Sequence, residues 1–159
     1  ETAEDAYLAR LRKHWPDEAL HESCCAFLLA YYEFWERHAR LLHMRNAMAD
    51  AGDLRVLHFR NDTTMPLIGR LADQIGRRDA RVDTIDANIA CVLLTGMERV
   101  ATVVTNPQFR IVTGAIADAD QRAYVRSLIE AEAEVLSVMI AHRRALADRA
   151  PRPHGAATQ

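Results

Sequence analysis

Residues 85–104 (IDANIACVLLTGMERVATVV) are apolar on most of their circumference when they are placed on a helix. After its first turn, this stretch carries formal charges only on Glu98 and Arg99. A helix that is apolar nearly all round must be covered nearly all round, which places it at the centre of a fold. Its charged middle and its short uninterrupted apolar run make it a poor candidate for a membrane span. We therefore predict a central helix with one side against its own domain and the other against a second copy of the chain.

At 159 residues, the chain has the length of a single domain. A chain near this length buries roughly 68–70% of its unfolded surface, so it needs no disulfide or metal for stability. Its net charge of -2 gives the whole chain no electrostatic attraction to nucleic acid. The 3 cysteines, which include the adjacent Cys24 and Cys25, fit a reducing compartment. No stretch has the pattern of a secretory signal peptide, and we expect a cytoplasmic location.

Apolar residues recur at helical spacing along nearly the whole chain, and no stretch alternates in the manner of a strand. We predict helices over residues 2–15, 17–38, 39–51, 53–75, 85–104 and 118–148. Pro16 and Gly52 separate some of these helices, and Pro66 predicts a kink inside the fourth. The last helix, like the central one, carries apolar residues over two neighbouring faces. The sequence thus predicts an all-α fold in which two helices have more apolar surface than one subunit covers.

This order of helices resembles the C-terminal, ligand-binding and dimerising domain of tetracycline-repressor (TetR) family regulators. The resemblance covers about residues 17–140, through the segments PDEALHES to GRLADQI (16–75), VDTIDANIACVLLTGMERVATVV (82–104) and the long last helix. In that family, an aromatic-bearing helix leads into a long helix, followed by two helices that pair with those of a second subunit. The resemblance therefore implies a TetR-family C-terminal helical domain that forms a homodimer through a four-helix bundle.

The same resemblance implies a role in transcription regulation. The family reads operator DNA through an N-terminal helix-turn-helix head, which nothing in this sequence matches. We therefore expect a connecting helix at 1–15 after a missing head, a ligand-binding and dimerisation domain at 16–150, and a disordered tail at 151–159. The expected function is ligand sensing by a transcriptional regulator, a repressor. Operator DNA would be bound only through the missing head, and no membrane is expected as a partner.

The resemblance also places a small-molecule pocket among the helices predicted at 17–38, 53–75 and 85–104. A mostly apolar cavity with a few polar groups is the usual composition of a ligand site, so a lipophilic ligand is expected. From helical spacing, we expect this pocket to be lined by Phe27, Tyr31, Phe34, Trp35, Asn61, Thr64, Ile68, Leu93 and Met97. Asn61 and Thr64 are the expected polar contacts, because a polar group on a buried face must find a partner. The alternative is that the aromatic residues are ordinary core and that Asn61 bonds the backbone carbonyl freed by Pro66.

Glu98 and Arg99 are adjacent on the central helix and therefore point in different directions. Two interpretations stay open for this pair of charges. In the first, one faces the pocket and the other faces the partner subunit. In the second, both lie at the rim of an interface or pair with the last helix. Buried charges need partners in either case.

The sequence carries no glycine-rich phosphate loop, no nucleophile elbow and no HExxH pattern, and we expect no enzymatic activity. Glu18 and His21 form one Glu-x-x-His pair, whereas a di-iron bundle needs two such pairs with further carboxylates. No metal and no other cofactor is therefore expected. Cys91, in the central helix, is expected to be an inert core thiol. The competing hypotheses are a helical-bundle enzyme with a cavity or di-metal site, and a purely structural dimerisation module.

Overall fold

The structure, a computed structural model, describes residues 6–77, 83–112 and 118–149. Every regular element in these ranges is helical, which confirms the predicted all-α class. The elements are α1 (Ala6–Arg10), the 3-10 turn η1 (Asp17–Ala19), α2 (Leu20–Asp50), α3 (Leu54–Ile75), α4 (Thr84–Val104), α5 (Phe109–Val112) and α6 (Asp118–Arg149). The tail predicted at 151–159 lies outside the described residues.

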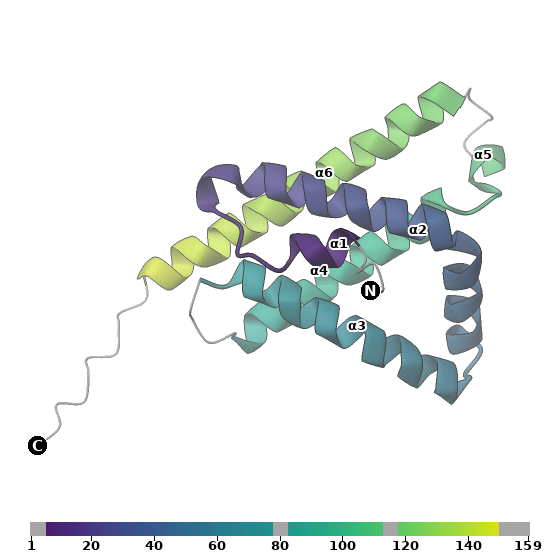
Figure 1. The fold of residues 1–159 in the computed structure, drawn as a ribbon, viewed down its shortest axis with the longest axis horizontal. Coiled ribbons are helices and arrows are strands. Elements are labelled where there is room, and N and C mark those ends of the chain that lie inside the picture. Colours follow the sequence, from purple (N-terminus) through teal and green to yellow (C-terminus); the bar gives the residue numbers. More distant parts are fainter. Residues whose placement is uncertain (1–5, 78–82, 113–117, 150–159) are drawn as a thin grey trace, which may run out of the picture.

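Two helix pairs make up most of the molecule (Figure 1). The most extensive helix contacts join α2 to α6 and α3 to α4, and α1 packs on α2. Fully buried alanines on α3, α4 and α6 allow the helices to approach closely; they are Ala72, Ala90, Ala101 and Ala133. Large side chains fill the space between the pairs, the most deeply buried being Phe27, Leu28, Trp35, Leu71, Ile75, Leu136 and Ile140.

The helices predicted at 17–38 and 39–51 form one continuous helix, α2. No glycine or proline lies between them, and the last part of α2 instead turns toward the beginning of α3 (Figure 1). Gly52, which was predicted to separate two helices, then adopts φ of 89°, a left-handed conformation that is common for glycine just after a helix. The Asp53 side chain accepts hydrogen bonds from the backbone N–H groups of Arg55 and Val56, at 3.0 and 3.4 Å, and so begins α3.

The first helix is shorter than predicted, because α1 ends at Arg10 and not near Trp15. The Gln74 side chain on α3 takes over the backbone groups that a longer helix would have used. Its Oε1 accepts from the Trp15 N–H at 2.8 Å, and its Nε2 donates to the carbonyls of Leu11 and Lys13, both at 3.2 Å. A tertiary contact of this kind overrides local helix propensity.

Arg144 on α6 ties the same segment to a third helix. Its Nη1 donates to the Trp15 carbonyl at 2.9 Å and to Asp17 Oδ1 at 2.5 Å, and its Nη2 donates to the Gln74 carbonyl at 2.6 Å. The side chain is buried, and these bonds satisfy two of its three nitrogens. The guanidinium groups of Arg144 and Arg77 hold the pKa of Asp17 below its ordinary value. The connection between α1 and α2 is therefore fixed at one point to both α3 and α6.

The central helix, α4, begins where it was predicted to begin. The Asp83 side chain accepts from the backbone N–H of Ile85 at 3.4 Å, and Asp86 in the first turn pairs with Arg143 of α6 at 2.7 Å. One side of α4 packs against the chain's own helices, through Ala90, Leu94, Met97, Ala101 and Val104. The opposite side exposes Ile85, Val92, Gly96 and Val103. The predicted excess of apolar surface on this helix is confirmed.

Cys91 corrects one expectation, because it lies on the exposed side of α4 and not in the core. The helix as a whole is long and apolar enough, by length and composition alone, to cross a membrane. The core helix of a soluble protein meets the same criterion but is mostly buried, whereas 28% of the most apolar window of α4 is buried inside the chain. On α6, Val135, Val138 and Leu146 are also exposed.

Candidate functional site

A cavity of about 500 Å³ lies between four helices, α1, α2, α3 and α4. Most of its wall is aromatic or aliphatic, and its volume falls in the range of small-molecule sites. The helix α2 supplies half of the wall because its last part turns toward α3. The lining residues are Tyr7, Tyr31, Phe34, Trp35, Leu41, Leu42, Met44, Arg45, Met48, Val56, Phe59, Thr63, Thr64, Leu67, Leu94 and Glu98.

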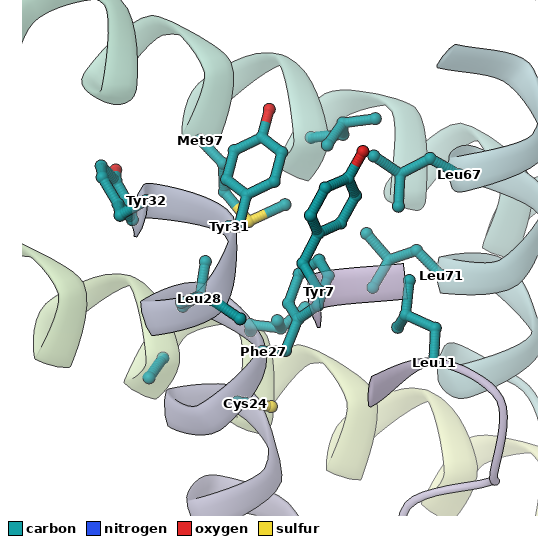
Figure 2. Close-up of a cluster of buried hydrophobic side chains, with 14 of the residues drawn as sticks. Tyr7, Leu11, Cys24, Phe27, Leu28, Tyr31, Tyr32, Leu67, Leu71 and Met97 are labelled. Atoms are coloured by element: carbon teal, nitrogen blue, oxygen red, sulfur yellow. The ribbon is translucent and has the colours of Figure 1, made fainter. Parts of the chain in front are cut away.

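Tyr7 and Tyr31 form the inner end of the cavity, where α1 lies on α2. Their rings meet edge to face with centroids 5.5 Å apart, and Tyr7 also lies 5.0 Å from Phe34. The two hydroxyl groups point to the same end of the buried cluster, away from Cys24 (Figure 2). Burial raises the pKa of Tyr31, so its phenol is neutral at ordinary pH. This end of the cavity therefore presents flat apolar surface with neutral hydroxyl groups.

The opposite end of the cavity opens to solvent between the last part of α2 and the first half of α3. Its rim consists of exposed apolar side chains, among them Leu41, Met44, Met48 and Phe59. Exposed apolar side chains that gather at the mouth of a cavity favour the binding of an apolar molecule. The two methionines also adapt easily to different shapes, because the side chain is unbranched and flexible.

One charged pair interrupts the apolar wall. Arg45 Nη2 on α2 donates to Glu98 Oε1 on α4 at 2.7 Å, and their side chains are 17% and 15% exposed. Asn46 contacts both members of the pair: its Oδ1 lies 3.1 Å from Nε and 3.0 Å from Nη2 of Arg45, and its Nδ2 lies 3.5 Å from Glu98 Oε1. Glu98 is therefore paired with α2, not with the last helix, while the neighbouring Arg99 is exposed.

The structure separates the predicted pocket residues into three groups. Tyr31, Phe34, Trp35 and Thr64 line the cavity. Phe27, Ile68 and Met97 are buried in the core outside its wall, and Leu93 is half-buried outside it. Asn61 is exposed, so the prediction that it lies on a buried face is wrong. The buried residues of α3 lie between Leu67 and Ile75, because only the second half of this helix packs into the bundle.

Other wall residues were missed by the sequence analysis. Tyr7 lies in the first predicted helix, and nothing in the sequence indicates that it reaches the cavity. Arg45 carries no local signal, because a basic residue at the end of a helix is usually on the surface. The positions of both depend on how α2 turns and on where α1 docks, which periodicity does not reveal.

His21, Cys25 and Glu134 form a small group of titratable side chains outside the cavity. Within the described ranges, no group of three or more His, Cys, Asp or Glu side chains is arranged to hold a metal ion. His21 lies 3.7 Å from Cys25 Sγ through Nδ1 and 3.5 Å from Glu134 through Nε2. Burial and nearby carboxylates raise the pKa of Cys25, which keeps this thiol protonated and a poor nucleophile at neutral pH.

Comparison of the chain with protein-family models, with curated proteins and with solved structures found no match. A functional proposal for this chain therefore depends on its own geometry.

Proposed function

We propose that this chain is the ligand-sensing and dimerising region of a TetR-like transcriptional regulator, a repressor. The observation that carries the proposal is the apolar cavity of about 500 Å³ to which α1 contributes Tyr7. In this proposal, the cavity binds a lipophilic small molecule, and α1 connects the sensing region to a DNA-binding head that precedes it. The chain itself carries out no catalysis.

The position of Tyr7 supports a link between the cavity and the head. A molecule in the cavity would contact α1 through Tyr7, α2 through Tyr31 and α4 through Leu94. Such a ligand shifts an equilibrium only as far as its affinities for the two states differ. Two heads that read DNA half-sites must stand about 34–36 Å apart, or a multiple of that, so a small movement of α1 would change operator binding.

The exposed apolar faces of α4 and α6 support a homodimer. Val92 on α4 is 71% exposed and Val138 on α6 is 57% exposed, and both point away from the chain's own core. A second copy would cover both faces, and such an interface is self-complementary about a two-fold axis. A membrane-spanning role for α4 is less well supported, because Glu98 and Asp86 on this helix pair with arginines of α2 and α6.

The first experiment tests whether the cavity binds an apolar molecule. Nile red, a neutral lipophilic dye, is titrated into the purified chain, and its fluorescence should rise to saturation. Thr64→Trp fills the cavity wall and should abolish the signal, whereas Asn61→Trp, an exposed site on the same helix, should leave it unchanged. Equal loss in both variants, or a signal that never saturates, would contradict a site in this cavity.

The second experiment tests regulation. The proposal requires a parent chain in which a helix-turn-helix head precedes α1 and binds operator DNA. A compound that competes with Nile red should change the affinity of that parent chain for its operator by about tenfold or more, within the usual range of coupling between sites. An operator affinity that does not respond to any such compound would remove the regulatory part of the proposal.

A further inference from the structure

The ion pair between Arg45 and Glu98 is the polar part of the cavity that most restricts what can bind there. Both residues line the cavity, and both are mostly buried by the helices around them. At 2.7 Å the two charges neutralise each other at close range. Arg60 pairs with Asp50 at 3.6 Å and also lies 4.0 Å from Glu98 Oε2, so two arginines and two carboxylates form one balanced group. The polar wall of the cavity therefore presents no net charge.

The hydrogen bonds of this pair are only partly used within the chain. Arg45 directs Nε and Nη2 to Asn46 Oδ1, and Nη2 also to Glu98 Oε1. Within the described ranges, its Nη1 makes no hydrogen bond, although a guanidinium carries five N–H donors. The second carboxylate oxygen, Oε2, has Arg60 at 4.0 Å, which is beyond hydrogen-bond distance. Nη1 of Arg45 and Oε2 of Glu98 therefore have no hydrogen-bond partner among the described residues.

A fully charged ligand fits this wall poorly. A carboxylate is attracted by Arg45 but repelled by Glu98, and an ammonium group is attracted by Glu98 but repelled by Arg45. Separating the two residues to accommodate either charge would leave a mostly buried ion without its partner, which is strongly unfavourable. A neutral group that both accepts and donates can instead bond Nη1 and Oε2 together. Such bonds to charged partners are about twice as strong as bonds between neutral groups.

We propose that the cavity selects uncharged amphipathic ligands whose polar end carries a hydrogen-bond acceptor beside a donor, as in a primary amide. This proposal rests on the proposed ligand-binding function and adds the chemical class of the ligand. The apolar body of the ligand lies against the rings of Tyr7, Tyr31 and Phe34, and its polar end lies against Arg45 and Glu98. The Asn46 side chain acts as a positioning residue, because it holds the guanidinium from outside the wall.

The test uses three probes of matched shape: 4-pentylbenzamide, 4-pentylbenzoate and 4-pentylbenzylammonium. Their affinities for the whole chain are measured at neutral pH by calorimetry and by competition with Nile red. The amide should bind about tenfold more tightly than either charged probe. A charged probe that binds as tightly as the amide would overturn the proposal.

Two variants test whether the ion pair is the cause. Glu98→Gln should shift the preference to the benzoate, because Arg45 is then unbalanced, and Arg45→Met should shift it to the ammonium probe. The matched controls are Glu130→Gln and Arg37→Met, which are the same changes at exposed positions and should keep the order of the wild type. If the two cavity variants keep the wild-type order while folding normally, the proposal is overturned.

The ranking in the unaltered chain decides the question even if a variant fails to fold. Failure of this inference also differs from failure of the proposed function. If Nile red binds with the predicted sensitivity to Thr64→Trp but the amide has no advantage, only the ligand class is wrong. If neither Nile red nor any of the three probes binds, the ligand-sensing function itself fails.

Discussion

A single buried amide decides where the first helix of this molecule ends. Gln74 is 2% exposed and bonds three backbone groups in the segment between α1 and α2. Leaving a buried polar group without a partner costs about 1–3 kcal/mol, so the Gln74 side chain is a large local contribution to stability. It also fixes the end of α1, and α1 contributes Tyr7 to the wall of the cavity.

We expect Gln74→Leu to lower the free energy of unfolding by about 2–4 kcal/mol, because three backbone groups lose their partner while the volume is kept. Unfolding in urea measures the loss, and Trp15 fluorescence reports whether the segment has come away from α3. The control is Gln108→Leu, the same change at an exposed position, which should alter stability by no more than about 0.5 kcal/mol. Equal effects of the two changes would contradict the role given to Gln74.

The bond between Tyr32 and Glu132 gives a second prediction at the scale of residues. The Tyr32 hydroxyl on α2 donates to Glu132 Oε2 on α6 at 2.8 Å. Burial raises the pKa of Glu132 above its ordinary value of 4.5, and the hydrogen bond from Tyr32 acts in the opposite direction. A carboxyl whose folded pKa is raised stabilises the fold most when it is protonated, and that contribution is lost as pH rises through the folded pKa.

Removing this hydroxyl should therefore matter most when Glu132 is ionised. We expect Tyr32→Phe to cost about 1–3 kcal/mol at pH 7, since a mostly buried carboxylate loses its donor. The cost should shrink as the pH falls toward 4.5 and the carboxyl takes up its proton. Urea unfolding at both pH values measures it, with Tyr124→Phe, at an exposed site on α6, as the control. A loss that is the same at both pH values would refute this assignment.

Single residues were the least predictable part of the candidate site. The periodicity of α2 placed Tyr31, Phe34 and Trp35 on a buried face, and they line the cavity. Asn61 was placed wrongly because the apolar stripe of α3 continues into the first half of the helix, which has little to pack against. Periodicity identifies which face of a helix is apolar but not how far along its length a partner helix extends.

Helix α3 consists of two halves with different surroundings. Its buried residues all lie between Leu67 and Ile75, whereas Val56, Phe59, Thr63 and Thr64 of the first half face the cavity. The helix is continuous through Pro66, which has no N–H and so removes one bond where the halves meet. Segments with few buried contacts open at lower free energy than the core of the same protein.

Hydrogen exchange should therefore divide α3 near Pro66. Amides at 56–65 should exchange at least about tenfold faster than those at 68–75, because opening of the first half exposes little apolar surface. Saturation with Nile red should slow the first half selectively, since that half forms part of the cavity wall. Uniform exchange along α3 would show that the first half is not less stable than the second. No response to the dye would show that the first half is not part of a binding site.

Most element boundaries followed from local signals. Asp53 and Asp83 begin α3 and α4, Gly52 ends α2, and the long last helix lies where its apolar pattern predicted. The early end of α1 has a tertiary cause, because it depends on Gln74 of α3, a contact that is not visible in the sequence near α1. The continuity of α2 has a local cause, since no glycine or proline interrupts it, and the short helix α5 was not predicted.

At the scale of the whole molecule, the main feature is apolar surface that the chain leaves uncovered. The exposed face of α4, with Ile85, Val92 and Val103, and that of α6, with Val135 and Val138, lie outside the cavity and the core. The sequence alone predicted that these two helices have more apolar surface than one subunit covers. In our proposal, a second copy of the chain covers this surface. That contact holds two sensing regions, and so two DNA-binding heads, together.

In the proposed dimer, charge placed on either face should separate the two copies. We expect Val92→Glu on α4 and Val138→Glu on α6 each to weaken dimerisation by at least about 100-fold, since a buried unpaired charge is strongly unfavourable. The fold of each subunit should stay intact, because both side chains are exposed in the single chain. The control is Ile111→Glu on α5, where the side chain is 78% exposed and belongs to neither α4 nor α6.

The most direct test of the central claim is the mass of the purified chain, measured by sedimentation equilibrium over a range of micromolar concentrations. The proposal predicts twice the chain mass of 17.9 kDa for the wild type and for Ile111→Glu, and a mass of 17.9 kDa for Val92→Glu and Val138→Glu. A wild-type chain that stays at 17.9 kDa at the highest concentration would contradict the paired sensor.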